Sequence, residues 1–188
     1  MASPQALSEI DRRRVALWAA DCAERVLPLF EAEAPGDDRV RDGIDRTRAF
    51  GRGDVDTAGE IRRRFETSRA ARSVQGPAAV AAVRAAGQAS AVAHMGAHAL
   101  GAAAYAAKAA ALAAPGRPGG PEQDDARRAE VRWQLDHISA DVRAALLRLP
   151  LLGADASGPL GSGLLATGVL ATTIREIQAQ MPGLTRAG

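Results

Sequence analysis

The sequence predicts an all-α fold, a helical bundle of about six helices around one long, Ala-rich central helix. Apolar residues make up 47% of the 188 residues, which is enough for one buried core. Aromatic residues make up only 3%, so Ala, Leu and Val must fill that core, and such small side chains let helices approach closely. No stretch of useful length alternates apolar and polar residues as a β-strand does.

The first two helices are predicted from spacing and capping residues. The first should run from about Glu9 to Glu31 after a capping signal at Ser8. Pro28 should kink this helix or end it early, because proline lacks an N–H and its ring clashes with the preceding turn. Asp37 or Asp38 can cap a second helix, which a Gly-Arg-Gly sequence ends.

The third helix is predicted to start at Thr57-Ala-Gly-Glu60, which matches the capping-box pattern. Ile61 and Phe65 are expected to face inward. Because the rest of this segment is strongly charged, the helix should lie on the outside of the bundle.

The central helix is expected to begin at Gly76-Pro77, since proline is tolerated in the first helical turn. From there to Ala114 the chain is rich in Ala, the best helix former. We therefore expect one long helix over residues 77–114, which can bend near Gly96.

The C-terminal part of the chain is expected to contain two more helices. A fifth helix should run from about Asp124 to Leu149 and end at Pro150. Residues 1–152 would then form the helical bundle domain, and residues 153–163 a Gly-rich linker that is flexible by composition. Residues 164–188 would form a last helix, Leu164 to Met181, and a tail docked on the bundle or on a partner.

Charge and cysteine content exclude several classes of protein. The net charge is only +2 and the arginine runs are flanked by acids, so we expect no nucleic-acid binding. Polar residues interrupt the Ala-rich segment and no signal peptide is recognisable, so we expect a cytoplasmic protein without a membrane span. Cys22 is the only cysteine, so no intramolecular disulfide forms, and we expect an inert core thiol.

One cluster of polar residues on the predicted central helix could carry chemistry. His94, His98, Gly101, Tyr105 and Lys108 follow the spacing i, i+4, i+7, i+11, i+14, which places them on one helix face. Two imidazoles, a phenol and the chain's only lysine could thus line a polar pocket between Ala-rich helices.

Three interpretations of this cluster stay open. His94 and His98 could be two ligands of a metal ion, but zinc needs at least one further protein ligand. They could act as general acid and base, with Tyr105 and Lys108 donating to a developing anion. They could also be hydrogen-bonded contacts between helices. We predict no bound metal and no cofactor, and catalytic residues stay unassigned.

Three residues outside the central segment are further candidates for ligand binding. Asp21 on the first helix could pair with His94, His98 or an arginine, or lie in water at the edge of the apolar stripe. Trp18 and Trp133 are expected to anchor the core, although either ring could instead wall a pocket.

Four segments resemble the immunity proteins of the immunity-five-like domain family, and together they span about Val15 to Leu149. They are ALWAADCAERVLPLFE at residues 16–31, DDRVRDGIDRTRAFGRG at 37–53, AAGQA at 85–89 with HMGAHALGAAAYAAK at 94–108, and EVRWQ at 130–134. The resemblance implies an all-α bundle from bacteria, mostly actinobacteria, that binds and neutralises a toxin or another harmful agent. It implies no catalytic residues, and the chain departs from it in the Gly-rich linker and the last helix.

The function predicted first is therefore non-catalytic binding of a toxin protein or a harmful small molecule. The acid-rich first helix and the Asp37-Asp38 turn could contact a basic partner. The alternative is a small-molecule-binding or catalytic protein of a bacterial secondary-metabolite pathway, with a pocket among the first, central and fifth helices. That pocket would be lined by Trp18, Asp21, His94, His98, Tyr105, Lys108 and Trp133. The last helix could also form a homodimer.

Overall fold

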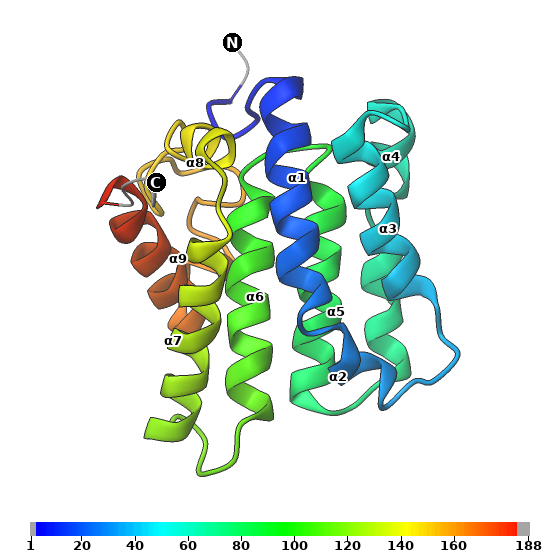
Figure 1. Cartoon of the computed structure of the whole chain (residues 1–188), viewed down its shortest axis with the longest axis vertical. Coiled ribbons are helices and arrows are strands. Elements are labelled where there is room, and N and C mark those ends of the chain that lie inside the picture. The colour runs from blue at the N-terminus through cyan, green and yellow to red at the C-terminus, as the bar shows by residue number, and fades with distance from the viewer. Residues whose placement is uncertain (1–2, 184–188) are drawn as a thin grey trace.

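Two Ala-rich helices form the centre of the fold in the computed structural model, which describes residues 3–183. These helices are α5 (Pro77–Ala91) and α6 (His98–Ala113), and the short turn 92–97 joins them into an antiparallel hairpin (Figure 1). Nearly all of their alanines are buried, because the two helices pack against each other and are covered by others. No strand occurs among the described residues, which confirms the all-α prediction.

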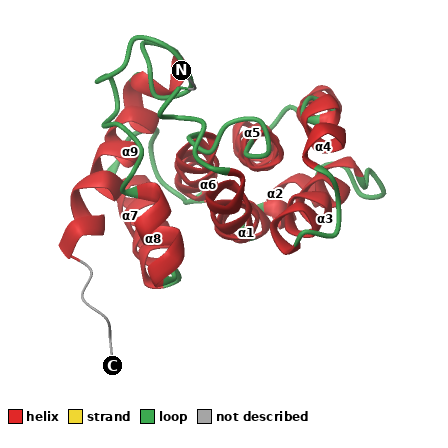
Figure 2. Ribbon diagram, turned by 90° about the horizontal axis from the view of Figure 1, so that it is seen from above, coloured by secondary structure: helices red, strands yellow, loops and turns green. Residues whose placement is uncertain are grey.

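The other helices surround this hairpin on both sides. α1 packs against both α5 and α6, α3 lies beyond α1 and α5, and α7 and α9 cover the far side of α6 (Figure 2). None of the helices among residues 3–183 is long and apolar enough to cross a membrane. The surrounding elements are α1 (Glu9–Glu24), α2 (Leu27–Glu31), α3 (Arg39–Arg52), α4 (Thr57–Arg63), η1 (Thr67–Ser73), α7 (Pro121–Asp136), α8 (Ala140–Leu146), η2 (Leu164–Ala166), α9 (Gly168–Gln180) and η3 (Met181–Gly183).

The expectation of one long helix over residues 77–114 is wrong. A helix of that length would extend about 57 Å and would leave most of its alanines without a packing partner. Folding back instead buries each helix against the other. The turn is held by the N-terminal segment, because Gly96 N–H donates to the Ala6 carbonyl at 3.1 Å and Ala97 N–H to the Gln5 carbonyl at 3.1 Å.

The predicted fifth helix also divides into two, α7 and α8. The break follows Asp136, and Ser139 caps the second helix by accepting a hydrogen bond from Val142 N–H at 3.2 Å. At the N-terminus, Pro28 ends α1 early as predicted and lies in the first turn of α2. α4 begins at Thr57 as predicted, but the capping-box assignment is wrong, because Asp56 caps the helix by accepting from Gly59 N–H at 2.7 Å.

The side chain of Gln5 binds the backbone of the Gly-rich loop, residues 153–163, and so fixes its path. Gln5 is fully buried, accepts a hydrogen bond from Leu160 N–H at 2.9 Å and donates to the Ser157 carbonyl at 2.5 Å. Within the loop, Gly153 N–H donates to the Leu160 carbonyl at 2.8 Å. The N-terminal segment, the 92–97 turn and this loop therefore meet at one residue. The domain boundary at residue 153 stays a prediction.

Gln5→Leu tests this junction. The substitution leaves the buried N–H of Leu160 without an acceptor, and we expect the free energy of unfolding to fall by about 1–3 kcal/mol. Urea denaturation measures the difference, with Gln75→Leu at an exposed position as the matched control. A Gln5→Leu variant as stable as the control would show that this side chain does not hold the loop.

Candidate functional site

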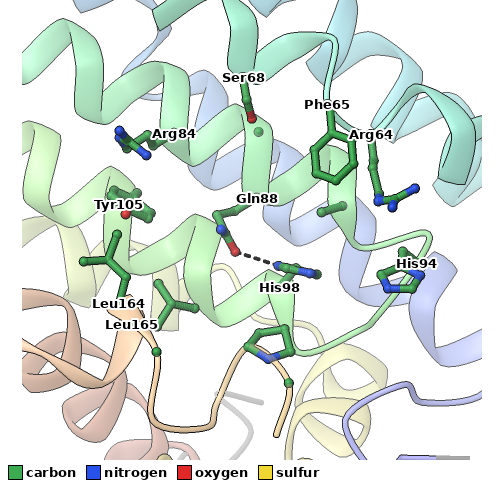
Figure 3. A pocket seen from close by; sticks show the side chains of 15 residues that line it. Arg64, Phe65, Ser68, Arg84, Gln88, His94, His98, Tyr105, Leu164 and Leu165 are labelled. Carbon is green, nitrogen blue, oxygen red and sulfur yellow. Dashed lines mark hydrogen bonds between the residues drawn. The ribbon is translucent and has the colours of Figure 1, made fainter.

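A pocket of about 480 Å³ opens beside the turn of the Ala-rich hairpin, between η1, α5, the start of α6 and the loop before η2 (Figure 3). The lining combines basic, polar and apolar side chains and contains no Asp or Glu. The residues are Arg64, Phe65, Ser68, Arg84, Gly87, Gln88, Ala91, His94, His98, Tyr105, Gly158, Pro159, Gly163, Leu164 and Leu165.

A hydrogen bond between the two central helices lies in the middle of the pocket. His98 Nδ1 and Gln88 Oε1 are 2.8 Å apart. Because an amide oxygen only accepts, Nδ1 carries the ring proton and Nε2 keeps its lone pair. Gly101 makes room for this pair, since a Cβ there would lie 2.3 Å from Gln88 Oε1.

The ring of His98 is neutral at pH 7. Burial disfavours the charged ring and lowers the pKa of His98 from 6.5 to about 4, and the nearby charges of His94 and Arg64 act in the same direction. His98 therefore contributes an acceptor to the pocket at neutral pH, and the positive charge comes from the arginines.

The two ends of the pocket carry different groups (Figure 3). At one end lie Arg84 of α5 and Tyr105 of α6, whose phenol is influenced by the arginine charge. Burial raises the pKa of Tyr105, while Arg84 acts in the opposite direction. At the other end the guanidinium of Arg64 lies over the ring of Phe65, 4.3 Å from its centroid, near His94.

Phe65 lies on the rim of this pocket and is 58% exposed, so the expectation that it faces inward is wrong. It follows α4, whose last turn ends before the ring can reach the core. Leu164 on the opposite rim is 62% exposed. The pocket is therefore bordered by two large apolar side chains that are open to solvent.

The structure brings four of the predicted site residues to this region. His94, His98 and Tyr105 line the pocket, and Lys108 lines a second hollow of about 290 Å³ that shares Arg84, Tyr105 and Leu164 with it. His94 is exposed and belongs to the turn, not to a helix, so the expected helical pairing with His98 does not form. Ligand binding by these residues stays a prediction.

The other three predicted site residues lie elsewhere. Trp18 is buried and donates from Nε1 to the Gln134 carbonyl at 3.0 Å, as a core residue does. Asp21 forms an ion pair with Arg48 at 2.8 Å and contacts neither predicted histidine. The ring of Trp133 lies between the Arg25 guanidinium and the His137 ring, each 4.0 Å away. Their predicted role in ligand binding is likewise untested.

The sequence analysis missed Arg84, Gln88 and Leu164 as site residues. Arg84 and Gln88 are the only long polar side chains on the Ala-rich α5, a signal that was available in the sequence. Leu164 had no such signal, because its position depends on the path of the preceding loop. Among residues 3–183 no group of three or more His, Cys, Asp or Glu side chains could hold a metal ion.

The lowered pKa of His98 predicts how stability depends on pH. Between pH 6.5 and about 4 the unfolded chain binds a proton at this ring and the folded chain does not, so acidification favours unfolding. We expect His98→Gln to lose less stability than the wild type over this interval. Urea denaturation at a series of pH values measures how the free energy of unfolding of each protein changes with pH. Equal slopes for wild type and variant would contradict the lowered pKa of His98.

Comparison with known proteins places this fold in a family. The family model described as Imm-5 like putative immunity protein matches residues 5–141, from the N-terminal segment to the start of α8. No curated protein and no solved structure matches the chain. The matched region includes the whole Ala-rich hairpin and leaves the 153–163 loop and α9 outside. The chain belongs to the family described as Imm-5 like putative immunity protein.

Proposed function

We propose that this protein neutralises a toxin protein by binding it, without catalysing a reaction, and that the pocket face is its contact surface. The observation that carries the proposal is the exposure of Phe65 and Leu164 on the rim of a concave, arginine-containing pocket. Aromatic residues, Phe among them, and Arg are enriched in protein–protein interfaces. Membership of an immunity protein family supports the same conclusion.

The pocket chemistry supports binding over catalysis. His98 is hydrogen-bonded to an amide and not to a hydroxyl or carboxyl group that it could activate. No hydrogen bond among the described residues joins Ser68 of the pocket to this ring. Cys22 is fully buried on α1, and burial raises its pKa well above the ordinary value, so its thiol is unreactive.

Most carboxylates of the acidic segments expected to contact a basic partner already bind arginines of the chain. Arg48 binds both Asp21 and Glu24, and Asp37 binds Arg39. A basic partner would have to displace these arginines. The hydrogen bond from Arg39 lowers the pKa of Asp37 well below its ordinary value. This supports the pocket face over α1 as the contact surface.

Leu164→Asp tests the proposed surface, with Phe65→Asp as a second variant on the opposite rim. Each places a charge in the proposed interface, and we expect protection against a toxin that the wild type neutralises to be lost. Co-expression with that toxin and counting of surviving cells is the measurement. Leu151→Asp is the matched control, since Leu151 is 66% exposed and does not line the pocket.

The three variants give distinct outcomes. Protection by Leu151→Asp but not by Leu164→Asp or Phe65→Asp supports the pocket face. Full protection by both rim variants would overturn it. Size-exclusion chromatography of toxin and wild type must show a complex, because protection without a complex would contradict neutralisation by binding.

A further inference from the structure

We infer that Arg84, Tyr105 and Lys108 form a site for a carboxylate, and that a Glu or Asp side chain of the toxin occupies it. The inference rests on the proposed function and specifies the partner's chemistry. The three side chains surround the junction of the two hollows, because Arg84 and Tyr105 line both and Lys108 lines the second. They come from both helices of the hairpin. Arg84 lies on α5, and Tyr105 and Lys108 lie on α6.

The three groups can all donate hydrogen bonds, and none of them has a carboxylate partner among residues 3–183. Arginine and lysine only donate, and the hydroxyl of Tyr105 can donate as well as accept. No Asp or Glu lines either hollow, and none of the ion pairs among residues 3–183 involves Arg84 or Lys108. A bound anion would supply the missing acceptor.

Several arginines elsewhere bind carboxylates of the chain, whereas others, such as the exposed Arg132, take part in no ion pair among residues 3–183 and line neither hollow. Arg48 binds Asp21 and Glu24, and Arg127 binds Glu176 at 2.5 Å as well as Asp124. These arginines stabilise contacts between helices. Arg84, in contrast, is exposed beside a buried phenol, where its charge is available to a partner.

A carboxylate fits the site better than a phosphate. Phosphate sites use free backbone N–H groups, often at a helix N-terminus. The N-terminus of α6 offers none nearby, because the N–H groups of Gly96, Ala97, His98, Ala99 and Leu100 all donate to backbone carbonyls. The start of α6 therefore adds no backbone donor for a phosphate, and the guanidinium with two further donors can bind a carboxylate.

The surroundings indicate a carboxylate on an apolar arm. Leu164 lines both hollows and is 62% exposed, and Val80, Leu112 and Leu170 line the second hollow. A Glu or Asp side chain of a protein surface carries such an arm and is flanked by neighbours that Leu164 and Phe65 can contact. A free small anion would leave these apolar side chains exposed.

Arg84→Gln and Lys108→Gln test the site in the complex of the full chain with a toxin that the wild type neutralises. Charge-assisted hydrogen bonds contribute about 1.5–3 kcal/mol, so we expect each variant to raise Kd at least about tenfold. Isothermal titration calorimetry measures Kd, and thermal unfolding verifies the fold. Arg132→Gln is the matched control, because Arg132 is an exposed arginine on α7 that lines neither hollow.

Tyr105 and Lys108 are the only tyrosine and the only lysine in the sequence, which allows a direct spectroscopic test. Incorporated 3-fluorotyrosine gives a single fluorine resonance at position 105. The probes are N-acetylglutamate amide, its glutamine analogue and inorganic phosphate. We expect a saturable shift with the glutamate probe, none with the neutral glutamine probe, and loss of the shift in Arg84→Gln.

The outcomes separate this inference from the proposed function. A wild-type Kd for Arg84→Gln and Lys108→Gln, together with lost binding by Leu164→Asp, would overturn the carboxylate site and leave the proposed function standing. A fluorine shift that phosphate or the glutamine probe produces as strongly as glutamate would also overturn it. If the wild-type chain does not bind the toxin at all, the proposed function itself is wrong.

Discussion

The close packing of α5 against α6 is the constraint on which the rest of the structure depends. Alanine buries little apolar surface, so an Ala-rich core is stable only where two helix backbones approach closely over many residues. The hairpin meets this condition, and Gly101 lets Gln88 lie against α6 where a methyl group would collide. The same packing sets the register between the two helices.

This register assembles the candidate site. In an antiparallel pair, residues near the turn of one helix face residues near the turn of the other. Gln88 therefore meets His98, and further from the loop Arg84 and Tyr105 line the same pocket. Polar groups that interrupt two otherwise apolar helices thus come together on one side of the hairpin, where η1 and the 153–163 loop complete the walls.

Much of the site could be predicted from spacing within one helix. His98, Tyr105 and Lys108 lie on α6, so their predicted shared face survives in the structure. His94 does not share this face, because it lies in the 92–97 turn that precedes α6. That turn depends on bonds to Gln5 and Ala6, about 90 residues away in sequence, and no local propensity of an Ala-rich segment reveals it.

The groups that sequence reasoning missed share a cause. Arg84 joins Tyr105 only through the hairpin register, and Leu164 reaches the rim only because Gln5 holds the loop that precedes it. The inward expectation for Phe65 assumed that α4 continues for another turn, whereas it ends at Arg63. Periodicity predicts which residues share a helix, but contacts between helices depend on the tertiary fold.

The pocket combines charge and apolar surface. Many arginines elsewhere, such as Arg48 and Arg127, pair with carboxylates of the chain. At the pocket, unpaired cations lie between exposed apolar side chains. This combination suits an interface in which apolar contacts exclude water from a charged pair.

Hydrogen–deuterium exchange on the toxin complex tests the central claim most directly, because it reports the contact surface without any substitution. If the pocket face is the contact surface, exchange on binding slows in residues 64–68 and 158–165 and stays unchanged in α7 and α8. The two segments form opposite walls of the pocket. Protection confined to α7 and α8, with unchanged exchange in both walls, would contradict it.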